Sequence, residues 1–172
     1  MLSLYDVSIP LFLRQLRNMD AFLEKGAAWF AEQGRPESDL TEARLIEDMA
    51  PLTGQIQRAS DSAKGVAVRV GGIEHVAMPD TEVTIADLRA RIARTIGLLE
   101  ATPREGFDGK DEAPVEVRTP NRTMAFTARD YVLGFALPNF FFHVTTAYAL
   151  LRKEGVPVGK MDYLGRVGMS EA

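Results

Sequence analysis

FALPNFFFHVTTAYALLR, residues 135–152, is the stretch of sequence that decides the fold. It lies within a predicted helix, from Tyr131 to Arg152, whose apolar side chains cover nearly the whole circumference. A helix that is apolar on most sides is expected at the centre of a bundle. Thr127 followed by Asp130 is a helix-capping pattern that predicts its start, and Gly155 marks its end.

Three amphipathic helices are predicted before this stretch, because apolar residues recur there at spacings of three and four. The first covers residues 12–30 and stops before Gly34. The second covers residues 51–70, with Pro51 at its start. The third covers residues 84–99, with Thr84 as its N-cap. The chain therefore predicts four long helices.

The segment between the third and fourth helices has a different pattern. Residues 115–117 and 123–126 alternate between apolar and polar side chains on either side of Pro120-Asn121, which predicts a β-hairpin. We expect an all-α four-helix bundle with this hairpin inserted. The connector of residues 72–83 could span roughly 40 Å, which lets the second and third helices run parallel. A simple up-down-up-down bundle is the alternative.

Composition narrows the class of protein. A chain of 172 residues with 46% hydrophobic and 26% charged side chains predicts one compact domain over residues 1–172. The formal charge of -4 provides no basic field for nucleic acid. Because there is no cysteine, disulfides and thiolate metal sites are excluded. We find no targeting segment and no stretch long enough to span a membrane, and we expect a cytoplasmic protein.

The helix order, the hairpin and the stretch of residues 135–152 resemble an uncharacterised bacterial family of the DinB/YfiT-like superfamily, whose members are regarded as metalloenzymes. Two further segments carry the same resemblance: ASDSAKG at residues 59–65 and GVPVGKMDYLG at residues 155–165. The resemblance covers essentially the whole chain. It implies a DinB-like bundle with up-down-down-up topology, often assembled as a homodimer.

The superfamily resemblance also implies a divalent metal held by three histidines. One comes from the second helix, and two form His-x-x-x-His on the fourth, where residues four apart lie on one face. His143 matches the first position of that pair, but Ala147 stands at the second. The second helix contains no histidine. We therefore expect no cofactor, with a divalent metal such as Zn or Ni as the alternative.

The sequence leaves two interpretations of His143. Asn139 and Thr146 lie four residues before it and three after it, on the same predicted face. In the structural interpretation, His143 is a neutral core residue whose ring nitrogens are satisfied by neighbours such as these. In the functional interpretation, the three form the polar wall of an apolar pocket in the bundle core, which would bind a small apolar molecule. Gln55 and Ser62 on the second helix could face the same pocket.

Other polar residues are weaker candidates. His75 lies on the predicted connector, where it would need a donor such as Glu74 to hold a metal. Asp61 and Lys64 are three apart on the second helix and predict an ion pair or an intersubunit contact. Three tail residues would either close one mouth of the bundle or only pin the C-terminus: Lys160, Asp162 and Tyr163. The aromatic run of residues 140–142 predicts core packing.

Two functions of different class follow. The first is a small-ligand binding or interaction protein without the metal triad. It would assemble as a homodimer through apolar side chains that lie outside the main stripe of the first helix, namely Ile9, Leu13 and Phe22. The second is an enzyme, a transferase or hydrolase by analogy of fold alone, in which His143 acts as acid or base.

Overall fold

The computed structural model describes residues 2–119 and 121–165. The fold is mostly helical and includes one small two-stranded antiparallel sheet, as expected. Within these residues, no helix is both long enough and apolar enough to cross a membrane.

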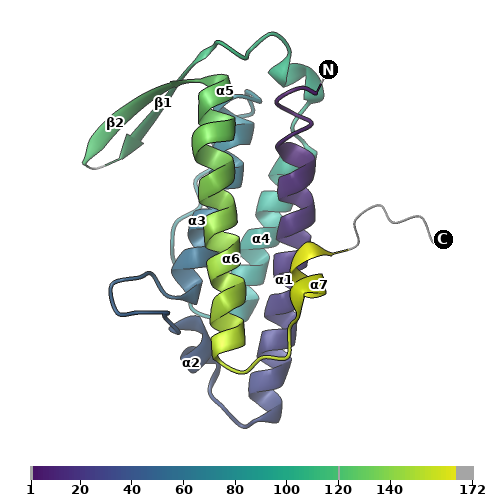
Figure 1. Ribbon diagram of the computed structural model, residues 1–172, viewed down its shortest axis with the longest axis vertical. Helices are drawn as coiled ribbons and strands as arrows, with labels where there is room; N and C mark the ends of the chain where they lie inside the picture. The colour runs from purple at the N-terminus through teal and green to yellow at the C-terminus, as the bar shows by residue number, and fades with distance from the viewer. Residues whose placement is uncertain (1, 120, 166–172) are drawn as a thin grey trace, which may run out of the picture.

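Four long helices lie side by side in Figure 1. They are α1 (Ile9–Glu32), α3 (Leu52–Arg69), α4 (Ile85–Glu100) and α6 (Leu137–Lys153). Three short helices accompany them: α2 (Glu37–Thr41), the 3-10 turn η1 (Arg104–Phe107) and α7 (Lys160–Leu164). The sequence pattern predicted the long helices but not α2, η1 or α7.

Helix α3 packs against both α4 and α6. The Ser60 hydroxyl lies 2.7 Å from that of Thr95 on α4, inside this contact. Near the ends of the same two helices, Gly71 lies close to Thr102, and a hollow joins Pro51 to Thr84. The N-terminal end of α3 therefore lies beside the N-terminal end of α4, and the C-terminal ends also lie together. The two helices run in the same direction. The connector of residues 72–83 returns the chain along the bundle.

Both predicted helix caps are present. The Thr84 hydroxyl accepts a hydrogen bond from the Asp87 amide at 3.1 Å, and the Asp87 carboxylate accepts one from the Thr84 amide at 2.9 Å. This reciprocal pair satisfies amides that the first turn of α4 leaves without helical partners. Thr127 accepts from the Asp130 amide at 3.1 Å in the same way.

The hairpin consists of β1 (Pro114–Thr119) and β2 (Arg122–Thr127), which pair antiparallel. Its inner face carries Val115 and Val117, both buried, because alternate residues of a strand point to the same side. Phe126 on β2 packs against Phe135, with ring centroids 5.5 Å apart. These contacts fix the root of the hairpin to the start of the last helix.

The last helix is one continuous run in three parts: α5 (Ala128–Asp130), the π-helical turn η2 (Tyr131–Ala136) and α6. Pro138 explains the wide turn, because proline has no amide hydrogen and its ring crowds the carbonyl of Gly134 four residues earlier. Widening the turn changes the directions in which the side chains before the proline point around the helix.

The buried side chains of the described residues form a continuous hydrophobic core. Three expectations from the sequence were wrong, at least in part. Ile9 and Phe22 are fully buried in this core, so they are not available for a dimer interface, and Leu13 is partly buried against it. The last helix is not buried on nearly all sides, because Leu133 and Phe142 are 47% and 54% exposed. Of the aromatic run, Phe140 is fully buried but Phe142 is not.

The tail docks on α1. The Tyr163 backbone carbonyl accepts hydrogen bonds from the side-chain amides of Gln15 at 2.9 Å and Asn18 at 3.0 Å. Asp162 forms an ion pair with Lys25. These contacts pin this end of the described chain to the first helix, which was one of the two expected roles of the tail.

Candidate functional site

His143 lies at the contact between α6 and α3. Its Nδ1 is 2.7 Å from Oε1 of Gln55, and its side chain is 8% exposed. The side-chain amide nitrogen of Gln55 donates to the Ala50 carbonyl at 2.9 Å, which turns Oε1 toward the imidazole. Nδ1 therefore carries the proton and donates it, and Nε2 is the acceptor of the ring.

The imidazole is neutral at physiological pH. Burial, and to a smaller extent the positive charge of Arg58, lower the pKa of His143 to about 4. A neutral, hydrogen-bonded histidine fits the structural interpretation, although the satisfying partner is Gln55 rather than Asn139 or Thr146. Gln55 was among the predicted site residues.

Asn139 forms the second polar link between the two helices. Its side-chain amide donates to the Ser62 hydroxyl at 2.7 Å, and that hydroxyl donates to the Arg58 carbonyl at 2.8 Å. Thr146 lies elsewhere. Its hydroxyl donates to the Phe142 carbonyl at 2.8 Å, and its side chain borders a separate hollow with Leu45. The structure thus brings four of the five predicted residues together and leaves Thr146 apart.

A groove of about 490 Å³ borders His143. We call it the α3–α6 groove. The residues that define it are Arg58, Asp61, Ser62 and Arg69 of α3, Tyr131 and Phe135 of η2, and Asn139 and His143 of α6. Strand β1 forms a further wall through Val117, Arg118 and Thr119. The groove opens at the surface, whereas the functional interpretation placed an apolar pocket in the bundle core.

Two arginines of the groove lie on one face of α3, because residues 58, 62, 65 and 69 are separated by three or four positions. Nη1 of Arg58 donates to the Gly54 carbonyl at 3.0 Å, and Nη1 of Arg69 donates to the Tyr131 hydroxyl at 3.1 Å. Among the residues that the structure describes, no carboxylate forms an ion pair with either arginine.

The single carboxylate of the groove, Asp61, is held by other cations. It pairs with Lys64 at 2.9 Å, as expected, and with Arg91 of α4 at 3.0 Å. Arg118 is paired with Glu116 on its own strand. The uncompensated charge of the groove is therefore positive and comes from Arg58 and Arg69.

His75 is exposed on the connector and borders a neighbouring hollow of about 400 Å³. Asp61, Lys64 and Arg69 line the same hollow, but His143 does not. Glu74, the expected second donor, is exposed and is not among its lining residues. The structure therefore does not join the two histidines in one site.

The residues present do not fit a three-histidine metal centre. Nδ1 of His143 is used by Gln55, and the fully buried Ala147 supplies no donor at the second position of the helical pair. Over residues 2–119 and 121–165, no group of three or more His, Cys, Asp or Glu side chains is arranged to hold a metal.

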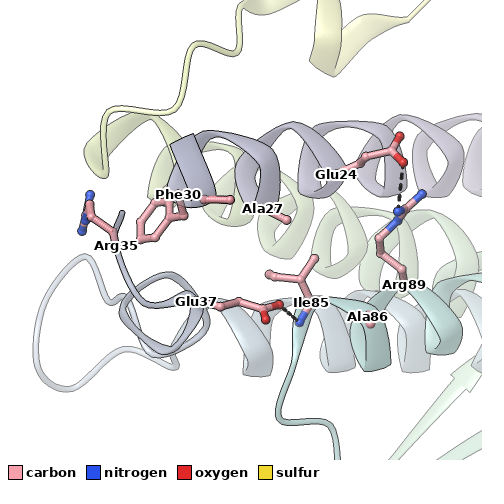
Figure 2. A pocket seen from close by; sticks show the side chains of 9 residues that line it. Glu24, Ala27, Phe30, Arg35, Glu37, Ile85, Ala86 and Arg89 are labelled. Atoms are coloured by element: carbon pink, nitrogen blue, oxygen red, sulfur yellow. Dashed lines mark hydrogen bonds and ion pairs between the residues drawn. The ribbon is translucent and has the colours of Figure 1, made fainter. Parts of the chain in front are cut away.

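A second cavity lies between α1 and the start of α4 (Figure 2). Its charged residues are already partnered: Glu37 accepts from the Ile85 amide, Arg89 pairs with Glu24 at 3.1 Å, and Arg35 pairs with Glu154 at 2.7 Å. The charged side chains around this cavity of about 300 Å³ therefore make structural contacts. The α3–α6 groove is the stronger candidate for a binding site.

The predominantly helical fold with a hairpin before its last helix is that of a DinB-like protein, as its likeness to a solved DinB family member shows. The family model of a domain of unknown function, DUF1993, matches residues 4–164, and the chain belongs to this family.

The chain is also similar to a solved structure, that of a DinB family member protein from Shewanella denitrificans. The two are 33% identical and superpose with a TM-score of 0.86, over 98% of this chain and 96% of the other. No curated protein matches the chain.

Seven residues that line the groove were not predicted as site residues: Arg58, Arg69, Val117, Arg118, Thr119, Tyr131 and Phe135. The polar ones that matter most are Arg58, Arg69 and Tyr131. A signal for the two arginines was present, because each follows a glycine by four residues on the predicted second helix, at Gly54 and Gly65. Tyr131 carried no such signal, since its place in the groove depends on the π-helical turn.

Proposed function

We propose that this chain binds a small molecule in the α3–α6 groove. The observation that carries the proposal is the meeting of hydrogen-bonding side chains from three elements at one groove of about 490 Å³. Ser62 comes from α3, Tyr131 from η2, and Asn139 and His143 from α6. A few convergent polar groups beside apolar walls are typical of ligand sites in helical bundles.

Binding is favoured over acid–base catalysis by the state of His143. With a pKa lowered to about 4, the ring lacks the second, acidic proton of the imidazolium at neutral pH, so it cannot act as a general acid. It is also a weak base at that pKa. Its acceptor nitrogen and the hydrogen-bonding groups beside it suit recognition of a ligand better than transfer of a proton.

We also propose that the helices form a DinB-type four-helix bundle with up-down-down-up topology. The parallel course of α3 and α4 supports this arrangement, as does the antiparallel course of α3 and α6. In that antiparallel pair Gln55 meets His143 and Arg69 meets Tyr131, so the groove runs lengthwise between the two helices.

The binding proposal is tested by screening the full-length protein against small metabolites and locating each hit by NMR. We expect at least one compound to shift the side-chain amide signal of Asn139 and the ring signals of His143. Asn139→Leu should weaken binding of that compound, because it removes the amide that faces Ser62.

Thr146→Val is the matched control, since Thr146 is on the same helix but borders a different hollow. It should leave the affinity unchanged. The proposal is wrong if every hit shifts signals away from the groove, or if Thr146→Val weakens binding as much as Asn139→Leu.

A further inference from the structure

We propose that the ligand of the α3–α6 groove is a small organic anion, whose carboxylate or phosphate group binds to Arg69 and Tyr131. This inference rests on the proposed function and adds the chemical class of the ligand.

Arg69 and Tyr131 together form a pair of hydrogen-bond donors. The Tyr131 hydroxyl accepts from Nη1 of Arg69 at 3.1 Å, which leaves the hydroxyl's own proton to be donated. Burial raises the pKa of Tyr131 despite the nearby guanidinium, so the hydroxyl keeps that proton at neutral pH. The guanidinium retains further N–H groups. The hydroxyl O–H of Tyr131 and the N–H groups of Arg69 can therefore donate hydrogen bonds to the oxygens of one anion.

Gly65 makes room for this pair. A Cβ atom at position 65 would lie 2.5 Å from Nη1 of Arg69 and 2.7 Å from the Tyr131 hydroxyl, closer than atoms can approach. Glycine inside a helix is less favourable than alanine. Its presence here allows the arginine and the tyrosine to meet directly above the helix backbone.

The close approach of an arginine to a glycine recurs at Gly54 and Arg58, there without a tyrosine. A Cβ atom at position 54 would lie 2.5 Å from Nη1 of Arg58, which donates to the Gly54 carbonyl. The two glycine–arginine pairs are eleven residues apart, about three helical turns, and so lie on the same face of α3. Both arginines line the groove, and neither is neutralised by Asp61, which Lys64 and Arg91 hold.

The rest of the groove suits the body of an organic molecule. Phe135 and Val117 line it between the polar groups, and both are packed against the core. An aromatic or aliphatic portion of the ligand can contact these side chains while its acidic group binds Arg69. A free inorganic anion would leave this surface uncovered.

The test uses three probes of similar size on the ¹⁵N-labelled full chain: phenylacetate, phenyl phosphate and the neutral phenylacetamide. Affinity is measured from NMR shifts of the Asn139 side chain and the amides of α3. We expect at least one of the two anions to bind at least about tenfold more tightly than the amide, because a charge-assisted hydrogen bond contributes that much. Which anion is preferred distinguishes a carboxylate ligand from a phosphate ligand.

Two variants test the residues. Arg69→Gln removes the charge, and Gly65→Ala keeps the charge but displaces the guanidinium, so each should abolish the preference for the anions. Arg17→Gln is the control for charge, since Arg17 is exposed on α1 and paired with Glu100. Gly97→Ala is the control for helical glycine, because a Cβ there meets open space. Both controls should bind like the parent.

Equal affinity for phenylacetamide and both anions would overturn the inference, as would normal anion binding by Arg69→Gln and Gly65→Ala. Failure of all three probes to bind in the groove would overturn it too. A metabolite hit that shifts the groove signals without any preference for anions would leave the proposed function standing while this inference fails.

Discussion

Gln55 holds the imidazole of His143 in the interface between α3 and α6, at 2.7 Å from Nδ1. We predict that His143→Ala lowers the free energy of unfolding at pH 7 by about 1 to 4 kcal/mol, because it opens a small cavity and leaves Oε1 of Gln55 without its donor. His143→Gln should recover part of this loss. Chemical denaturation measures both, and a His143→Leu variant as stable as the parent would contradict the prediction.

The same residue makes stability depend on pH. Because the pKa of His143 in the folded protein is lowered to about 4, whereas that of an unfolded chain stays near 6.5, the unfolded state binds the proton more readily. The contribution of His143 is complete above pH 6.5 and is lost as the pH falls from there to about 4. Its upper limit is about 3 kcal/mol.

Denaturation curves at several pH values check this prediction. His143→Leu should flatten the profile between pH 6.5 and 4. Asp6 and Asp162, whose pKa values are lowered by hydrogen bonds from Arg104 and from the Gly159 amide, lose their contributions only below their ordinary value near 3.8. If the free energy of unfolding of His143→Leu changes with pH as steeply as that of the parent, other groups cause the pH dependence.

At the scale of elements, Arg91 joins α4 to α3 and to the connector of residues 72–83. Its side chain is 1% exposed and lies 3.0 Å from carboxylate oxygens of Asp61, Asp80 and Glu82. Arg91→Met should lower the free energy of unfolding by about 2 to 4 kcal/mol, because Glu82 stays largely buried after its cation is removed.

Arg17→Met serves as the comparison for Arg91→Met. Arg17 and its partner Glu100 are both more than half exposed, and such pairs contribute no more than about 1 kcal/mol. Thermal or urea unfolding of the two variants should therefore differ clearly. Similar losses would mean that Arg91 contributes no more than a surface ion pair does.

The long elements could be predicted from the sequence because their signals are local. Apolar residues at helical spacing predicted α1, α3 and α4, and strand alternation predicted the hairpin. Helices α2 and α7 have only five residues each, too few for a periodic pattern. The π-helical turn could not be predicted for another reason. A proline inside a helix can be accommodated by a kink, a break or a widened turn, and the sequence does not show which of these forms.

The candidate site was predictable only in part. His143, Asn139, Ser62 and Gln55 lie on the facing sides of two predicted helices, so the helical wheel was enough to place them near one another. It did not predict that His143 bonds to Gln55 and Asn139 to Ser62. The positions of Arg58, Arg69 and Tyr131 depend on tertiary structure. Where the hairpin docks, and how far an arginine folds back over a glycine, are set by contacts between elements that are distant in sequence.

At the scale of the whole molecule, the expected homodimer must use a surface other than Ile9 and Phe22, which are buried. Leu45 and Phe142 are exposed side chains that border an apolar hollow of about 450 Å³. We predict a dimer of twice the 19.0 kDa chain mass that associates through this face.

Light scattering checks the assembly. Phe142→Glu should convert the dimer to a monomer. Leu133→Glu should not, because Leu133 is also exposed but does not border this hollow. A monomer mass for the parent protein at micromolar concentration would rule out the dimer. A dimer that persists in Phe142→Glu would show that another face is used.

The docking of α7 on α1 has a consequence for local opening of the native protein. No residue of α7 is fully buried. Its attachment consists of polar contacts from Gln15, Asn18 and Lys25 and of half-buried Tyr163, which packs against Tyr148 of α6. Detaching α7 therefore costs less free energy than global unfolding, and its amides should exchange with solvent hydrogen well before those of α3. Each such opening exposes the otherwise buried amide of Gln15, so the surface of α1 that solvent and proteases encounter is intermittently larger than the closed structure presents.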